Sequence, residues 1–129
     1  MIAAVDTVDG VVLVDVEEES VLGPGSELPP VDAPAVDLPR VVATAGSGAT
    51  IVAVVERRPP LAISNDAGAT WREAGGGLPA GFAVAVAEDD PDRMLFAARN
   101  RLYLSTDGGV FWRSLEPELP DISAIAWID

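Results

Sequence analysis

The sequence of 129 residues contains neither cysteine nor histidine. These two absences exclude disulfide frameworks, thiol nucleophiles, the usual zinc sites and imidazole general bases, and with them most familiar hydrolase mechanisms. Lysine is missing too, so all 8 basic residues are arginines, and 21 acidic residues give a net charge of −13. Nucleic acids and anionic lipids are bound chiefly by basic side chains, so the charge predicts neither as a partner and favours basic partners or cations.

Long apolar runs are also missing, and none approaches the roughly 20 residues that a membrane-spanning helix needs. The first six residues lack the basic start and the longer apolar stretch of a secretory signal, so we expect a cytoplasmic protein unless a leader has been removed. The apolar fraction of 49% and the mean hydropathy of +0.28 argue against disorder. One folded domain without membrane contact is therefore expected.

A repeat of about 41 residues organises the chain. Residues 64–71, with the sequence SNDAGATW, recur 41 positions later as STDGGVFW in residues 105–112. The same offset relates Leu61 to Leu102 and the Leu-Pro pair at 78–79 to that at 119–120. This length matches the four-stranded blade of a β-propeller, which takes about 40–45 residues.

Strands are expected wherever apolar residues alternate or run between turn signals. Residues 82–87 alternate a bulky residue with alanine, so both faces are apolar, as in an inner blade strand covered on both sides. By the same reasoning we expect strands at 2–7, 11–16, 41–45, 51–56, 61–64, 70–73, 94–98, 102–105, 111–115 and 122–128. The predicted fold class is therefore all-β, with about three four-stranded antiparallel propeller blades in the chain.

The repeat divides the chain into four segments. Residues 1–40 form a degenerate blade, in which Glu17–Ser20 replaces the repeated turn and the acidic, proline-rich residues 20–39 form a loop with at most a poor outer strand. Residues 41–81 and 82–121 are two complete blades. Residues 122–129 are the first strand of a composite blade, because the chain begins at the second strand of one blade and ends at the first strand of another.

The repeated motif resembles the Asp-box, or BNR repeat, of sialidases and other glycoside hydrolases, sortilin-type receptor domains and photosystem II assembly factors. It is carried by Ser64, Asp66, Gly68, Thr70, Trp71, Ser105, Asp107, Gly109 and Trp112. The second copy departs at Phe111, where the family prefers threonine, and the resemblance covers residues 41–129 well and 1–40 weakly. It implies a β-propeller with these turns at the blade periphery. It implies no single function, because unrelated activities share the box.

Physical chemistry gives the box a structural role. Asp66 and Asp107 are expected to accept bonds from the backbone N–H groups of their own turns, while Gly68 and Gly109 supply the positive φ that such turns need. The tryptophan that ends each box is expected to pack against the next strand or blade.

No catalytic residue is assigned. A sialidase-like site needs converging arginines, a tyrosine nucleophile and acidic helpers, yet the single tyrosine, Tyr103, falls in a third strand, away from the axis of a propeller. The arginines are scattered, and Arg72 and Arg113 follow the box tryptophan directly, which indicates a recurring surface position.

No metal or cofactor is expected. The acidic residues Glu88, Asp89, Asp90 and Asp92 offer oxygen ligands for calcium, but a turn at Asp90-Pro91 explains them without a metal. Residues 17–19 are interpreted as a solvated loop. The glycines at 75–77 precede Leu78-Pro79 as a connection and not as a phosphate-binding loop.

Three blades are too few to close a ring, since propellers use about four to eight. We expect a twofold homodimer with six blades, in which residues 122–128 of one chain pair with residues 1–7 of the other. The expected composite-blade interface comprises Ile2, Ala4, Val5, Ile125 and Trp127. Two alternatives remain open: a partner chain supplies the other blades, or the chain is a fragment of a longer propeller.

The leading functional prediction is a non-catalytic binding or assembly module. Its protein or glycan ligands would meet the loops at the axial openings or the proline-rich residues 20–39. The alternative is a carbohydrate-active propeller, glycan-binding or glycoside hydrolase-like, with a site at the dimer axis. A third alternative is a structural remnant that has lost its ligand.

Overall fold

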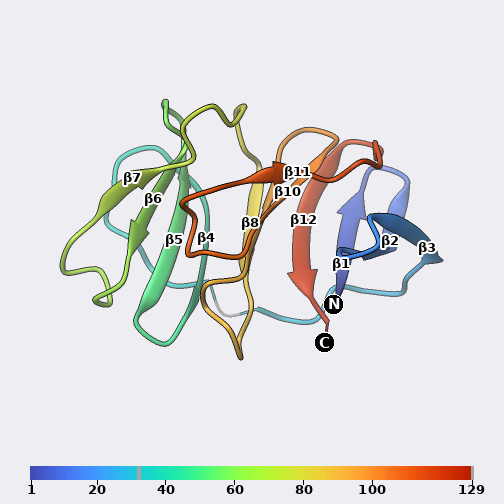
Figure 1. The fold of residues 1–129 in the computed structure, drawn as a ribbon, viewed down its shortest axis with the longest axis horizontal. Coiled ribbons are helices and arrows are strands. Elements are labelled where there is room, and N and C mark those ends of the chain that lie inside the picture. Colours follow the sequence, from blue (N-terminus) through green and yellow to red (C-terminus); the bar gives the residue numbers. More distant parts are fainter. Residues whose placement is uncertain (32, 129) are drawn as a thin grey trace.

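The computed structural model describes residues 1–31 and 33–128, and their regular structure consists of strands alone (Figure 1). The strands are β1 (Ile2–Thr7), β2 (Gly10–Asp15), β3 (Ser20–Pro24), β4 (Val41–Ser47), β5 (Thr50–Val55), β6 (Leu61–Ser64), β7 (Arg72–Ala74), β8 (Ala83–Val86), β9 (Met94–Ala97), β10 (Leu102–Ser105), β11 (Arg113–Ser114) and β12 (Ile122–Trp127). The described residues contain no helix that could cross a membrane.

The strands form three antiparallel sheets of four strands, which we call blades. Blade I has the order β12-β1-β2-β3, blade II the order β4-β5-β6-β7, and blade III the order β8-β9-β10-β11. The predicted fold class, all-β with propeller-type blades, is confirmed. The predicted bounds match the observed ones in β1, β6 and β10. The outer strand of blade I, β3, has 5 residues and is longer than the outer strands β7 and β11, which corrects the expectation of at most a poor outer strand there.

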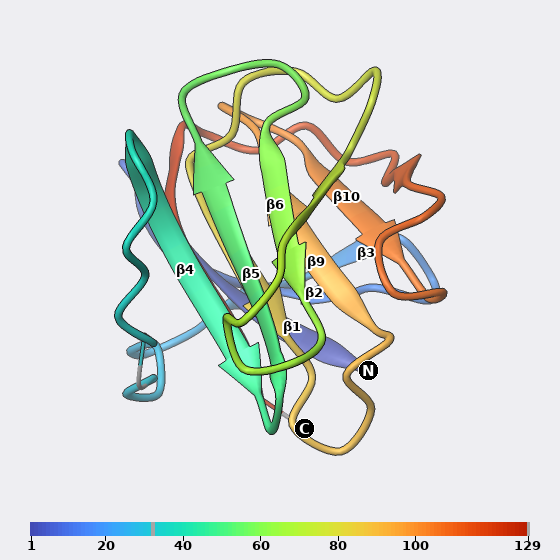
Figure 2. The same cartoon turned by 90° about the vertical axis from the view of Figure 1, so that its left-hand side faces the viewer.

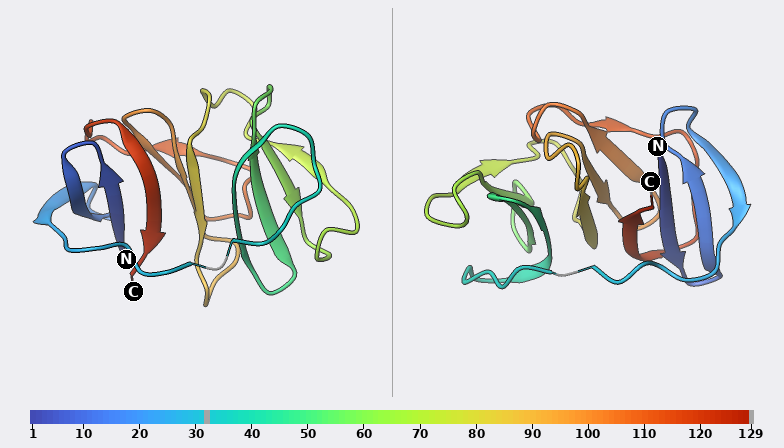
Figure 3. Two further views of the ribbon diagram at one scale, coloured as in Figure 1. Left: turned by 180° about the vertical axis from the view of Figure 1, so that it is seen from behind. Right: turned by 90° about the horizontal axis from the view of Figure 1, so that it is seen from below.

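The blades lie side by side as an arc in the order II, III, I. β8 of blade III contacts both β4 and β12, so the three inner strands follow one another along the concave side. The view from below shows the arc and its open side, where a closed propeller would continue (Figure 3).

Blade III is apolar on both faces because it is covered on both sides. One face carries Leu95, Leu102 and Leu104, which pack against Val5 and Val14 of blade I. The other face packs against blade II through a second cluster, Ala45, Val52, Val54, Leu61, Ile63, Ala74, Leu78, Val84, Met94, Phe96 and Ala98. The alternating pattern of residues 82–87 therefore correctly predicted a strand that is covered on both faces. Phe82 itself lies just before β8 and is half exposed.

Phe96 is the largest fully buried side chain, and it lies in the cluster between blades II and III. Its ring meets Tyr103 and Trp112 edge-on, with centroid separations of 5.9 and 6.0 Å. Gly81 lies directly against the ring, and a Cβ at this position would clash with it. The packing of the two blades thus centres on one aromatic residue.

Residues 25–31 and 33–40 run from the end of blade I to the start of blade II, and we call them the strap. The strap crosses the open side of the arc and then follows β4 (Figures 2 and 3). The hydroxyl of Thr44 on β4 donates to the carbonyl of Pro34 at 2.9 Å. Val36 and Leu38 pack with Trp71 on the end face of blade II, over Ala53, Val55 and Ala62. The end face of blade II is therefore covered by the chain itself.

The composite blade forms within one chain. β1 pairs with β12 in the register Ala3↔Trp127, Ala4↔Ala126 and Val5↔Ile125, and the N–H of Ile128 donates to the carbonyl of Ile2. This corrects the expectation that the pairing joins two chains. The two ends of the chain lie side by side (Figure 1), so the interface residues Ile2, Ala4, Val5, Ile125 and Trp127 meet without an exchange of strands.

We expect Phe96→Ala to lower the free energy of unfolding by about 3–5 kcal/mol, because it removes a fully buried ring from the interface between two blades. Urea denaturation followed by circular dichroism measures the change. Phe111→Ala is the matched control, since that ring is 78% exposed and its loss should change stability by no more than about 0.5 kcal/mol. Equal losses in the two variants would contradict this account of the core.

Candidate functional site

A hollow lies at the lower end of the arc, beside the strap. It has a volume of about 740 Å³ and is lined by Glu27, Pro29, Glu88, Asp89, Trp127 and Ile128. A second hollow of about 510 Å³ adjoins it and lies between the strap at 29–31 and the inner strands β4, β8 and β12. The two share Pro29, Glu88 and Trp127, and we call them together the axial groove. This size suits a ligand or a short segment of another chain.

The groove combines an apolar wall with an acidic rim. Trp127, Ile128 and Pro29 supply the apolar surface at its lower end, and Glu27, Glu88 and Asp89 supply carboxylates that are exposed to solvent. The strap contributes Glu27, and the connection between β8 and β9 contributes Glu88 and Asp89. Ser47 at the end of β4 donates its hydroxyl to the carbonyl of Glu88 at 3.0 Å, which fixes that connection against blade II.

The predicted box residues form two compact turns. In turn 64–71 the hydroxyl of Ser64 donates to Asp66 Oδ1 at 2.8 Å and accepts the N–H of Gly68 at 2.8 Å. The carboxylate of Asp66 also accepts the N–H of Thr70 at 2.8 Å and the hydroxyl of the same residue. The aspartate thus accepts the backbone bond predicted from the sequence, and the serine makes two further bonds in the turn that were not predicted.

Turn 105–112 repeats the serine bonds of the first turn and the backbone bond to the aspartate. The hydroxyl of Ser105 donates to Asp107 Oδ1 at 2.8 Å and accepts the N–H of Gly109 at 2.9 Å. Asp107 Oδ1 accepts the N–H of Phe111 at 3.0 Å. The phenylalanine therefore keeps the backbone bond that the threonine of the first turn makes and loses only the hydroxyl bond.

These bonds lower the pKa of both aspartates because they favour the charged carboxylate. The hydroxyl and the backbone N–H of Thr70, helped by the hydroxyl of Ser64, hold the pKa of Asp66 at about 2, against an ordinary value of 3.8. The pKa of Asp107 is also lowered, first by the N–H of Phe111 and then by the hydroxyl of Ser105.

The turns pack on blades and stay away from the groove. Trp112 joins the cluster between blades II and III, and Trp71 packs on the end face of blade II under the strap. Gly68 and Gly109 take φ values of 93° and 90°, as the turn geometry requires. None of the box residues is among the described residues that line the groove.

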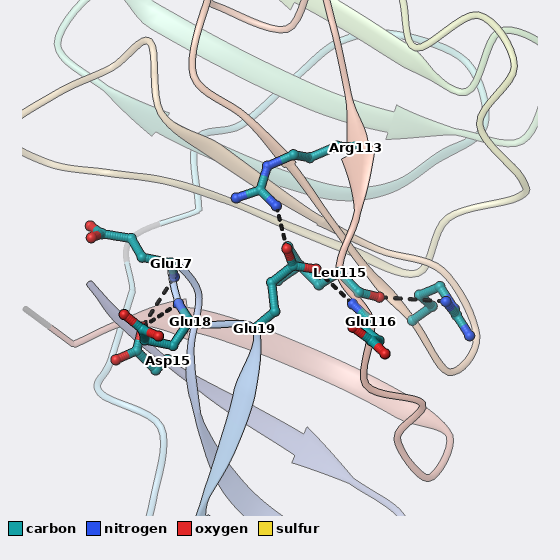
Figure 4. A network of polar contacts seen from close by, with 8 residues as sticks. Asp15, Glu17, Glu18, Glu19, Arg113, Leu115 and Glu116 are labelled. Carbon is teal, nitrogen blue, oxygen red and sulfur yellow. Dashed lines mark hydrogen bonds and ion pairs between the residues drawn. The ribbon is translucent and has the colours of Figure 1, made fainter.

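Arg72 and Arg113, the two arginines that follow the boxes, each reach to the next blade along the arc. Arg72 Nη2 donates to the carbonyl of Gly108, in the turn of blade III, at 2.7 Å. Arg113 Nη1 donates to Glu19 Oε2, in the turn between β2 and β3 of blade I, at 2.7 Å (Figure 4). The recurring surface position noted in the sequence is therefore a contact between blades.

Blade I replaces the missing box with a different turn (Figure 4). Asp15 Oδ1 accepts the N–H groups of Glu17 and Glu18 at 3.1 and 3.0 Å. Glu19, at a φ of 52°, turns its carboxylate toward blade III and accepts the N–H of Glu116 at 2.8 Å in addition to Arg113. Glu17 and Glu18 are exposed to solvent, as expected from the sequence, whereas Glu19 is held against blade III.

The remaining candidates have structural surroundings. Tyr103 packs on Phe96 between the blades. Asp90 Oδ1 accepts the N–H of Asp92 at 3.3 Å, which is a local turn bond. Within residues 1–31 and 33–128, no group of three or more acidic side chains is arranged to hold a metal ion. Sequence reasoning placed ligands at the axial openings or at the proline-rich residues 20–39, which include the strap residues of the groove. It did not assign the individual groove residues, because they come from four segments that only the arc and the strap bring together.

We expect Asp66 to make the stability depend on pH in acid. A carboxyl whose pKa is lower in the folded state than in the unfolded state stabilises the fold above the unfolded value, and this stabilisation is lost as the pH falls through the folded value. For Asp66 the window lies between about pH 4 and pH 2. Asp66→Asn should melt below the wild-type protein at pH 7, and the gap should close as the pH falls to about 2.

Thermal melting followed by circular dichroism across this range measures the gap. Asp9→Asn, at an exposed position outside the box turns, is the control and should track the wild-type protein. A gap that stays constant from pH 7 to pH 2 would contradict the role assigned to the ionised carboxylate.

Comparison with known proteins supports the fold. No family model and no curated protein matches the sequence. Among solved structures, a GH74 enzyme from Niastella koreensis, a β-propeller glycoside hydrolase, is similar with a TM-score of 0.52 and 20% sequence identity. The match covers 94% of this chain and 18% of the enzyme, so the chain spans less than a fifth of that structure. The architecture described above is thus similar to part of a β-propeller.

Proposed function

We propose that this protein is a non-catalytic binding or assembly module of the Asp-box type that holds its ligand in the axial groove. The observation that carries the proposal is the groove itself, because a hollow of about 740 Å³ joins an indole ring, other apolar surface and three carboxylates at one place. The proposal of the Asp-box type rests on the paired serine and aspartate bonds in turns 64–71 and 105–112.

The construction of the groove also supports binding. Its walls come from the inner strands of three blades, which are fixed by the two clusters between them, so the shape is preorganised. Its remaining side comes from the strap, whose residues 36 and 38 are held on blade II. A rigid wall that faces a tethered segment suits the capture of a ligand.

A carbohydrate-active protein is the second candidate. The specific observation in its favour is the combination of Trp127 with Glu27, Glu88 and Asp89, because glycosidases act through paired carboxylates. The two candidates differ in turnover: a binding module leaves an oligosaccharide intact, whereas a hydrolase cleaves it.

The test is a titration of the isotopically labelled full chain, followed by nuclear magnetic resonance, with three probes: a neutral peptide, a sialoside and a plant β-glucan oligosaccharide. We expect at least one probe to shift the signals of groove residues such as Glu88 and Trp127 without being cleaved. Ser47→Trp, which places a large ring in the groove, should abolish these shifts, whereas Val42→Trp at an exposed position outside it should not.

Cleavage of the glucan or the sialoside would favour the carbohydrate-active candidate. Shifts that map outside the groove, or that survive Ser47→Trp in a folded variant, would overturn the groove as the binding site.

The homodimer stays a prediction, as does the cytoplasmic location. The dimer is supported by apolar surface at the blade I end of the arc. There, Val21 and Leu22 on β3 and Ile128 after β12 are between 41% and 51% exposed. Because the strap occupies the end face of blade II, a ring of six blades needs the strap to move. Light scattering over a dilution series measures the mass in solution. A mass of twice 13.4 kDa supports the dimer, and a constant mass of 13.4 kDa contradicts it.

A further inference from the structure

We propose that the axial groove binds an extended, arginine- or lysine-bearing segment of a partner protein. This inference rests on the proposed function and specifies the ligand of the same groove. It commits to a basic peptide, and a neutral glycan is an outcome that the test distinguishes.

The first support is uncompensated charge. The ion pairs among the described residues involve other carboxylates, and none of them includes Glu27, Glu88 or Asp89. No arginine is among the described residues that line the groove. With a net charge of −13 over the whole chain, the local field and the long-range field both attract a cation.

The second support is the apolar wall beside these carboxylates. Arginine and lysine carry an alkyl stem below a charged head, so they bury the stem against apolar surface while the head stays near carboxylates and water. Trp127 and Pro29 line both hollows of the groove, and Ile128 extends the wall at its lower end. A guanidinium also stacks favourably on an indole ring. A small inorganic cation would leave this wall unused.

The third support is unpaired backbone along the groove. β4, β8 and β12 are each an edge strand of their sheet, so one side of each has no strand beside it among the described residues. Residues 45–48, 84–86 and 125–127 of these strands, with their adjoining turns, line the groove. An extended peptide can pair its own N–H and C=O groups with such an edge, whereas a free amine or a sugar cannot form a strand. The groove thus matches a peptide backbone as well as a basic side chain.

The experiment compares two peptides that differ only in charge. The probe is the capped peptide acetyl-Ala-Arg-Val-Arg-Ala-amide, and its twin carries citrulline in place of both arginines, so that neutral ureas of similar shape replace the guanidinium groups. Calorimetry with the full chain gives the two affinities, and magnetic resonance maps the contacts.

We expect the arginine peptide to bind about tenfold more tightly than its twin, since two exposed charge contacts contribute up to about tenfold together. We also expect shifts at residues 27, 88, 89 and 125–127, and weaker binding when the salt concentration is raised.

Two double variants separate the groove from the overall charge. Glu88→Gln with Asp89→Asn should remove most of the difference between the two peptides. Asp9→Asn with Glu18→Gln removes the same net charge at exposed positions outside the groove and should change the affinity less than twofold. Thermal melting of both variants confirms that they remain folded.

Equal affinity for the two peptides, or an equal loss in both double variants, would overturn the inference. If the glucan oligosaccharide shifts the groove residues and neither peptide does, the inference fails while the proposed function stands. If no peptide, sialoside or glucan shifts the groove residues, the proposed function fails as well.

Discussion

The antiparallel pairing of β1 with β12 is the constraint on which the rest of the structure depends. It joins residues from the two ends of the chain and gives blade I its inner strand. That strand supplies Ile122 and Ile125 to the cluster between blades I and III, and Trp127 to the axial groove. Without this pairing, blade III would lose the cover of one apolar face and the groove would lose its aromatic wall.

The contacts between blades have a direction along the arc. Blade II reaches to the turn of blade III through Arg72, and blade III reaches to the turn of blade I through Arg113. β3, the outer strand of blade I, carries no arginine with which to continue the series. At the other end, the strap covers blade II with Val36 and Leu38. The series of arginine contacts therefore stops at blade I, and the strap covers the outer face of blade II.

The sequence was sufficient to predict the structure in the segments where a pattern repeats. The offset of 41 residues located the blades and the two turns, and the backbone bond that Asp66 accepts was expected from its residue type. The sequence was insufficient to predict contacts between segments that lie far apart in the chain and share no repeated pattern. Alternation in residues 122–128 indicates a strand but cannot say whether its neighbour belongs to the same chain. The strap has no period, so its cover of blade II was not predictable, and a ligand was expected only at residues 20–39 as a whole.

The side-by-side ends of the chain have a mechanical consequence. Ala3 lies opposite Trp127 at the end of the pairing where β1 begins and β12 finishes. A force that pulls residues 1 and 128 apart therefore acts perpendicular to β1 and β12 and separates their residue pairs one after another. Such peeling resists far less force than sliding two strands past each other, because the hydrogen bonds break singly. Tension on the two ends would therefore open blade I first, and the cluster between blades II and III would stay intact.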